Sequence, residues 1–185
     1  ALVGLALLAA ADAAHGPAAA AYLQRAASVA AFLTQSGLWD DTFGGGFWWN
    51  SRRGDTIEGK PSQSNGLAAL LFLRLRAATG AAHWRVWAER TLAWLDAHLW
   101  DGDRRLYRYC VRYAVPSERR GRVVEERYFN YDQGILIECL AEHAVQRGDA
   151  VALGRAQAIA GTLEEAFWDG ELGGFVLEAG VPQVF

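Results

Sequence analysis

Two kinds of helix alternate in the hydrophobic pattern of this chain. Apolar runs begin at three glycines, as GLALLAA from Gly4, GLAALLF from Gly66 and GILIECL from Gly134. A helix that is apolar nearly all round must be covered on all sides. Each run is followed by an amphipathic segment, and in the middle one the large apolar residues fall near one face, namely Trp84, Trp87, Trp94 and Leu95. We therefore predict helical pairs with an inner first helix and an outer second helix.

The same pattern predicts where these helices begin and end. A glycine follows each apolar run at Gly16, Gly80 and Gly148, a position that favours a left-handed helix end. Pro17 suits the first turn of the next helix, and Asp149 suits an N-cap.

A Trp-Asp pair follows each outer helix, at Trp39-Asp40, Trp100-Asp101 and Trp168-Asp169. Each tryptophan lies 34 or 35 residues after the glycine that opens its unit, and successive units begin 62 and 68 residues apart. Short strand-like aromatic runs come next, at 44–50, 105–110 and 173–178. This common spacing predicts one domain, 1–185, built of three hairpin repeats over about 1–50, 62–110 and 130–178.

Stacked helical hairpins form either an open solenoid or a closed (α/α) toroid. Six such hairpins need roughly 370 residues by the repeat length. The chain of 185 residues is therefore expected to be all-α and to form about half of a six-hairpin toroid, with short β-hairpin-like loops. It begins without Met, which fits a fragment whose start has been lost.

Composition narrows the function. Lys and Arg number 18 against 21 Asp and Glu, so the net charge of -3 argues against a nucleic-acid partner. No apolar stretch reaches the roughly 18 residues of a membrane span. The apolar start resembles a signal-peptide core, but the repeat assigns residues 1–15 to the first inner helix, so neither a signal peptide nor a compartment is assigned.

No motif indicates a metal or a cofactor. The four histidines lack zinc-motif spacing, and there is no Walker loop, GxGxxG after a strand, or GxSxG. Cys110 and Cys139 have no CxxC context and are predicted to be thiols in or near the core. The charged run over 118–127 is interpreted as a solvated loop.

Candidate chemistry lies in the polar segments that lead into the inner helices. Their N-termini gather at one end of a toroid, where amide, hydroxyl and phenol groups suit sugar hydroxyls. Ser64 and Asn65 fit either this role or helix capping. For Tyr131, Asp132 and Gln133 we favour binding, because three large polar groups exceed what a cap needs.

The densest aromatic segment is WDDTFGGGFWWN, residues 39–50. Asp40 has equivalents in both other units and is expected to serve the turn, whereas Asp41 is Gly elsewhere and is a fallback catalytic carboxylate. Trp48 and Trp49 alternate, so one is expected in the core and one at a cleft.

The segments GLWDDTFGGGFWWN (37–50) and YFNYDQG (128–134), with the lead-in to Gly66 between them, resemble glycoside hydrolase family 76, the α-1,6-mannanase family. The resemblance covers most of the chain and implies hydrolysis, with retention, or transfer of α-1,6-linked mannan, in a secreted or cell-envelope setting. It also implies a catalytic Asp pair just before Ala1. Asp132 departs from the family, which usually has Asn there. Substrate-binding roles carry over to Trp48, Trp49, Asn65, Tyr131, Asp132 and Gln133.

Two other functions stay open. One is a sugar epimerase or isomerase of the N-acylglucosamine 2-epimerase type, which shares the hairpin toroid but resembles a histidine-based chemistry. The other is a non-catalytic helical repeat that binds carbohydrate. A half-toroid exposes apolar walls, so inactivity of the isolated chain and self-association are also expected.

Overall fold

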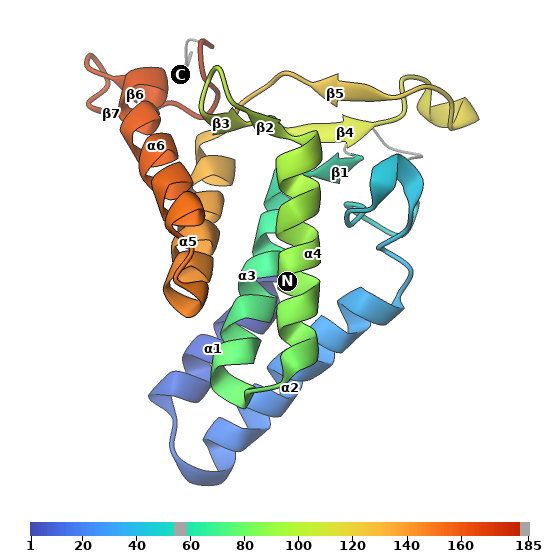
Figure 1. The fold of residues 1–185 in the computed structure, drawn as a ribbon, viewed down its shortest axis with the longest axis vertical. Helices are drawn as coiled ribbons and strands as arrows, with labels where there is room; N and C mark the ends of the chain where they lie inside the picture. Colours follow the sequence, from blue (N-terminus) through green and yellow to red (C-terminus); the bar gives the residue numbers. More distant parts are fainter. Residues whose placement is uncertain (54–58, 182–185) are drawn as a thin grey trace.

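The computed structural model describes residues 1–53 and 59–181, and this part of the chain forms three helical hairpins (Figure 1). In each hairpin two consecutive helices pack along each other. Their bounds are α1 (Leu2–Ala13), α2 (Gly16–Gln35), α3 (Ser62–Thr79), α4 (Ala82–His98), α5 (Asn130–Arg147) and α6 (Ala150–Phe167). The predicted all-α class and its partial toroid of hairpins are confirmed.

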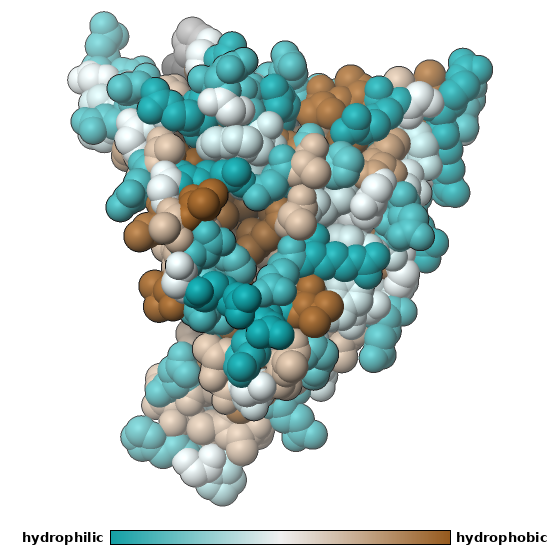
Figure 2. All heavy atoms as spheres, in the orientation of Figure 1, coloured by the Kyte–Doolittle hydropathy of each residue, from teal (hydrophilic) through white to brown (hydrophobic). Residues whose placement is uncertain are grey.

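The first helix of each hairpin forms the inner layer. α3 packs against both α1 and α5, and it carries the largest buried share of the core. The outer α4 buries a single aromatic and aliphatic face against it, including Trp84, Trp94 and Leu95. Figure 2 shows polar side chains over much of the viewed face, with hydrophobic side chains in the hollow between α4 and α6.

The glycines that open the apolar runs allow the inner helices to approach closely. A Cβ on Gly4 would lie 2.7 Å from the Leu71 side chain of α3. A Cβ on Gly66 would lie 3.0 Å from Ile135 of α5. Both distances are shorter than ordinary van der Waals contact, so the absence of a side chain determines how near these helices pack.

Two of the predicted glycine helix ends are confirmed. Gly80 and Gly148 end α3 and α5 with φ of 73° and 67°, in the left-handed region that favours glycine. Asp149 caps α6 as predicted, because its carboxylate accepts hydrogen bonds from the backbone N–H groups of Val151 and Ala152.

The prediction for Gly16 was wrong. α1 already ends at Ala13, and Gly16 is the first residue of α2, with Pro17 in the first turn as predicted. Gly16 does have a left-handed φ of 59°, but it uses this conformation to lead into α2 and not to end α1. Pro17 fixes a helical φ directly after it, so the Gly-Pro pair starts the second helix.

Short strands lie at one end of the helices (Figure 1). The Trp-Asp pairs of the second and third units form two-stranded ladders as predicted, and the first unit has a single Trp39–Phe47 bridge. A further sheet, in which residues 60–61, 110–112 and 123–125 lie side by side in this order, was not predicted. The strands are β1 (Lys60–Pro61), β2 (Trp100–Asp101), β3 (Leu106–Tyr107), β4 (Cys110–Arg112), β5 (Val123–Glu125), β6 (Trp168–Asp169) and β7 (Gly174–Phe175).

The unpredicted sheet corrects one interpretation. The charged run 118–127 is not only a solvated loop, because β5 lies within it and pairs antiparallel with β4. Cys110 of β4 and Cys139 of α5 are buried free thiols, as predicted. Within residues 1–53 and 59–181, no helix combines the length and the hydropathy that crossing a bilayer requires.

Candidate functional site

A cavity of about 370 Å³ lies where α1 and α3 begin. It opens beside residues 38–50, which we call the aromatic loop. Its lining is apolar and aromatic with two polar side chains from the first turn of α3: Ala1, Leu2, Leu33, Leu38, Phe47, Trp48, Trp49, Gln63, Ser64, Leu67 and Ala68. Apolar walls with a few polar groups are typical of a small-ligand site. We call this cavity the aromatic-loop pocket.

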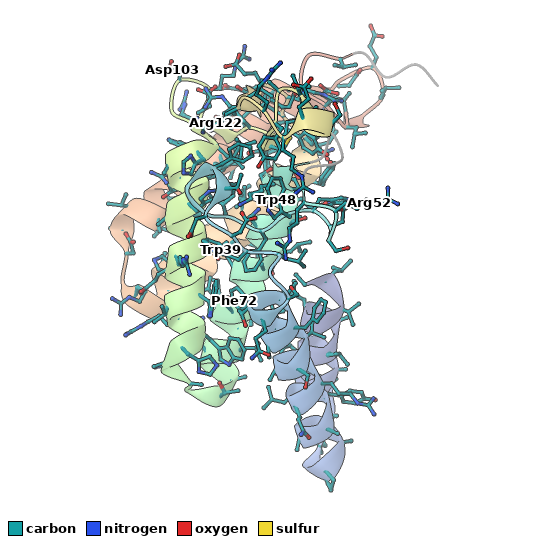
Figure 3. The ribbon with its side chains drawn as sticks, turned by 90° about the vertical axis from the view of Figure 1, so that its right-hand side faces the viewer. Trp39, Trp48, Arg52, Phe72, Asp103 and Arg122 are labelled. Atoms are coloured by element: carbon teal, nitrogen blue, oxygen red, sulfur yellow. The ribbon has the colours of Figure 1, made fainter. Side chains whose placement is uncertain are left out.

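The glycines of the aromatic loop let it pack directly on α4. Gly46 has a φ of 85°, and a Cβ there would lie 2.5 Å from the Trp94 ring. Trp39 lies edge-on to Phe47 at 5.0 Å and to Trp87 of α4 at 5.6 Å. These contacts fix the loop to the helical core, as the side view in Figure 3 shows for Trp39 and Trp48.

The two adjacent tryptophans of the loop have opposite environments. Trp48 is buried, and its indole N–H donates to Asp40 Oδ2 at 2.7 Å. Trp49 is 48% exposed and also lines the aromatic-loop pocket. One tryptophan therefore lies in the core and the other at the surface, as the alternation predicted, although the segment is a turn and not a regular strand.

Lys60 anchors the loop, a role that sequence reasoning missed. Its side chain is completely buried, and its ammonium donates to Asp40 Oδ1 at 2.7 Å. It also donates to the carbonyl oxygens of Asp40, Thr42 and Gly45, at 3.2, 2.7 and 2.6 Å. The ammonium lies 4.7 Å from the centre of the Trp48 ring. Burial lowers the pKa of Lys60 to about 8, so the side chain is still charged at pH 7.

Asp40 serves the turn, as predicted. Its Oδ1 accepts from the Thr42 N–H two residues ahead. Asp101 and Asp169 accept the equivalent bond in the other units, and each accepts a second one from the N–H three residues ahead. Burial acts to raise the pKa of Asp40, but hydrogen bonds from Lys60 and Trp48 outweigh it and lower that pKa. Asp40 is therefore a structural anion.

The fallback carboxylate Asp41 lies in solvent. Its side chain is 99% exposed and lies 3.9 Å from Arg90 of α4. It is not among the residues that line the aromatic-loop pocket.

Asn65 and Gln133 both clamp the backbone of a preceding loop. Asn65 Oδ1 accepts from the Phe47 N–H at 2.7 Å, and its amide donates to the Phe47 carbonyl at 3.1 Å. Gln133 makes the same pair of bonds to Tyr107, at 2.8 and 2.9 Å. Both side chains are fully buried. Each side-chain amide thus takes the place of a neighbouring strand, because it bonds both the N–H and the C=O group of one residue, Phe47 or Tyr107.

We expect Gln133→Ala to lower the free energy of unfolding by about 2 kcal/mol, because it leaves the buried N–H and C=O groups of Tyr107 without partners. Urea denaturation measures the change. Gln24→Ala, at an exposed position of α2, is the matched control and is expected to change stability by less than about 0.5 kcal/mol. Equal effects of the two substitutions would show that the clamp contributes nothing.

The polar segments thought to precede the inner helices lie inside their first turns. α3 begins at Ser62 and α5 at Asn130, and their N-caps are Pro61 and Phe129, neither of which has a capping side chain. The capping alternative for Ser64 and Asn65 is therefore wrong. Asn65 instead bonds the Phe47 backbone, and Ser64 lines the aromatic-loop pocket.

Asp132 and Tyr131 lie at the start of α5. Asp132 is buried and accepts from the Ser62 hydroxyl at 2.9 Å, while its other carboxylate oxygen has no hydrogen-bond partner. Burial raises the pKa of Asp132 to about 7. Tyr131 is half-buried, its ring stacks on Phe129 at 5.4 Å, and burial together with Asp132 raises its pKa to about 12. Asp132 thus joins α3 to α5 beneath a surface on which Tyr131 remains partly accessible.

Comparison with known proteins defines the class. The family model for glycosyl hydrolase family 76 matches residues 1–183. The chain therefore belongs to glycosyl hydrolase family 76. No curated protein matches the sequence.

Solved structures agree with this fold. A family 76 α-mannanase from Bacteroides thetaiotaomicron is 19% identical with a TM-score of 0.76, covering 94% of this chain and 45% of that one. An inactive variant of an α-1,6-mannanase from Salegentibacter sp. HEL1_6, in complex with α-1,6-mannotetrose, is 21% identical with a TM-score of 0.76, covering 90% and 47%. A D-mannose isomerase is 16% identical with a TM-score of 0.72, covering 95% and 46%. The chain spans about half the length of these proteins.

Proposed function

We propose that this chain forms the aromatic wall of a binding cleft for α-1,6-linked mannan in a glycoside hydrolase. The aromatic-loop pocket is the observation that supports this proposal most strongly. It places an exposed indole, an amide and a hydroxyl at the N-terminal ends of two inner helices. Flat aromatic faces and hydrogen-bonding groups together suit a sugar ring. Family membership and the mannotetrose complex of a structural neighbour point to the same ligand.

Within this proposal the six binding residues divide into two groups. Trp49 and Tyr131 retain accessible surface and contact the sugar. The buried group holds the loops and helix ends in place: Trp48, Asn65, Asp132 and Gln133. Positioning of this kind matters because a site must hold its contact groups to within a fraction of an ångström.

The reactive carboxylates are proposed to come from outside the pocket lining. A retaining glycosidase needs two carboxyl groups about 5–5.5 Å apart. No Asp or Glu is among the residues that line the aromatic-loop pocket, and the first residue of the lining is Ala1. By the family resemblance, an Asp pair directly before Ala1 would bring both carboxylates to this place. A longer chain that includes that pair should release mannose oligomers from α-1,6-mannan, whereas residues 1–185 alone should not. Turnover by residues 1–185 would contradict this assignment.

We expect Trp49→Ala to weaken binding of α-1,6-mannotriose about tenfold, since losing one stacking face removes roughly 1–2 kcal/mol. Calorimetric titration of residues 1–185 measures the affinity without requiring turnover. Trp168→Ala is a matched control, because Trp168 is also 48% exposed but lies on β6. Equal losses in the two variants, or no binding by the unaltered chain, would remove the aromatic-loop pocket as the sugar site.

The isomerase alternative has one observation in its favour, the fold shared with D-mannose isomerase. The histidines give it less support, since none of them lines the aromatic-loop pocket. They lie at the start of α2, on the outer helix α4, and in the C-terminal half of α5: His15, His83, His98 and His143. Isomerisation of mannose by the longer chain, with no release from mannan, would favour this second function.

Self-association is also part of the proposal. Leu2 and Val3 of α1 are each 66% exposed, and α6 exposes Val151. Large apolar side chains exposed on the first and the last helix of the hairpin array favour association in water. Analytical ultracentrifugation of residues 1–185 tests this, and a monomer at all concentrations would contradict it.

A further inference from the structure

A second hollow, of about 220 Å³, lies where α3 and α5 end. Three arginines from three different helices account for most of its lining, which is Arg76, Ala77, Arg85, Gln146 and Arg147. No carboxylate is among these residues. We call this hollow the arginine pocket.

The guanidinium groups of the arginine pocket are incompletely neutralised. Glu89 of α4 is close to two of them: its carboxylate lies 3.4 Å from Arg147 Nε and 4.0 Å from Arg85 Nε. The Arg85 Nε–H is buried and has no hydrogen-bond partner. Within residues 1–53 and 59–181, Arg76 forms no ion pair. In this part of the chain one carboxylate is therefore shared by two of the three guanidinium groups, the third has none, and one buried donor has no acceptor.

The walls of the arginine pocket are held in place before any ligand arrives. Gln146 of α5 donates to the Leu73 carbonyl of α3 at 3.1 Å, which ties the two inner helices together. α4, which provides Arg85, packs along α3. The volume is below the roughly 300–1,000 Å³ of common small-molecule pockets, so it suits a single ionic group better than a large ligand.

We propose that the arginine pocket binds a phosphoryl oxyanion. Guanidinium groups present forked donors that match phosphate oxygens, and a dianion would satisfy the buried Arg85 Nε–H. Arg76 and Gln63 are 13 positions apart on α3, which places this site about 20 Å from the aromatic-loop pocket. The proposal therefore does not rest on the mannan-binding function. The oxyanion is either free phosphate or the phosphate group of a phosphorylated sugar.

The same arginines have a second explanation that the experiment must separate. Arg76 and Arg147 lie in the last turns of α3 and α5, where cations compensate the negative end of the helix dipole. That explanation does not account for Arg85, which is near the start of α4. It predicts lower stability in arginine variants with or without phosphate, and no phosphate binding.

The test is titration of residues 1–185 with inorganic phosphate at constant ionic strength, followed by calorimetry and by the melting temperature. We expect saturable binding that raises the melting temperature, and at least tenfold weaker binding in Arg85→Gln and in Arg76→Gln. Arg25→Gln, at an exposed position of α2, is the control and should bind as the unaltered chain does. Absence of saturable binding, or equal affinity in the Arg85, Arg76 and Arg25 variants, would overturn the proposal.

Using two variants keeps the test decisive if Arg85→Gln fails to fold, because Arg76 is only partly buried and forms no ion pair among the described residues. A hexose 6-phosphate titrated beside inorganic phosphate and the unphosphorylated hexose identifies the source. Tenfold tighter binding of the hexose phosphate supports a phosphorylated sugar, whereas equal affinity supports free phosphate. Binding of the unphosphorylated hexose that displaces phosphate would overturn the oxyanion assignment.

Discussion

Replacing Lys60 with methionine is expected to lower the free energy of unfolding by about 3–5 kcal/mol, the usual cost of removing one partner of a buried ion pair. Methionine fills a similar volume but donates no hydrogen bond. Asp40 would lose its cation, and the carbonyl oxygens of Thr42 and Gly45 would lose their donor. We expect this to be the most destabilising change among those considered, because a single ammonium holds both ends of the aromatic-loop turn.

The matched variant Lys60→Arg separates charge from geometry. It keeps the charge but brings a larger, planar group into a site enclosed by four close oxygen contacts, so we expect an intermediate loss of about 1–3 kcal/mol. Chemical denaturation at pH 7 measures both variants, with Arg25→Met on α2 as the control. A loss below about 1 kcal/mol in Lys60→Met would contradict the anchoring role.

The reactivity of the Lys60 amine can be used to measure opening of the aromatic loop, because Lys60 is the only lysine among the 18 basic residues. Acetylation of its amine, followed by mass spectrometry, reports opening of the aromatic loop without interference from other lysines. The modification should be slow in the folded chain and should become faster in variants that loosen the loop, such as Asn65→Ala.

Replacing Asp132 with asparagine is expected to stabilise the chain by about 3 kcal/mol at pH 8. Burial raises the pKa of Asp132 from 3.8 to about 7. A shift of that size corresponds to at most about 4 kcal/mol, at roughly 1.4 kcal/mol per pKa unit. Asparagine keeps a hydrogen-bond acceptor for the Ser62 hydroxyl but carries no charge. It is also the residue that the family usually has at this position.

The stabilisation by Asp132→Asn is expected to depend on pH. Between pH 3.8 and about 7 the folded chain binds more protons at Asp132 than the unfolded chain, so the free energy of unfolding falls as pH rises through this window. The gain from Asp132→Asn should therefore be near zero at pH 4 and largest above pH 7. Thermal and urea unfolding from pH 4 to 8 measure it, with the exposed Asp12→Asn of α1 as the control. A gain that does not vary with pH would show that Asp132 is ionised throughout.

Much of the fold follows from local sequence patterns. The alternation of all-apolar and amphipathic segments predicts inner and outer helices, because each helix is buried on as many sides as it is apolar. Gly80, Gly148 and Asp149 were correctly placed because end chemistry depends on neighbouring residues alone. Gly16 was wrongly predicted to end the first helix, because Pro17 beside it determines the start of the next helix.

The candidate site was less predictable. Lys60 lies 20 residues from Asp40, and no spacing rule connects a lone lysine to three carbonyl groups of a distant turn. Residue type favoured sugar binding for Gln133 and left it open for Asn65, and the family resemblance implied it for both. The structure shows their amides bonded to backbone groups 18 and 26 residues away.

The sequence alone therefore determined the helical hairpins, their repeat, the Trp-Asp turns and the family. These features depend on periodicity and on contacts within a few residues. Only the tertiary structure decided which polar side chains form hydrogen bonds inside the protein and which remain accessible at its surface. Burial is a property of the whole packing arrangement. That is why Trp48 and Trp49, neighbours in the chain, differ so much in exposure, and why Asp132 retains a carboxylate oxygen that no neighbouring residue satisfies.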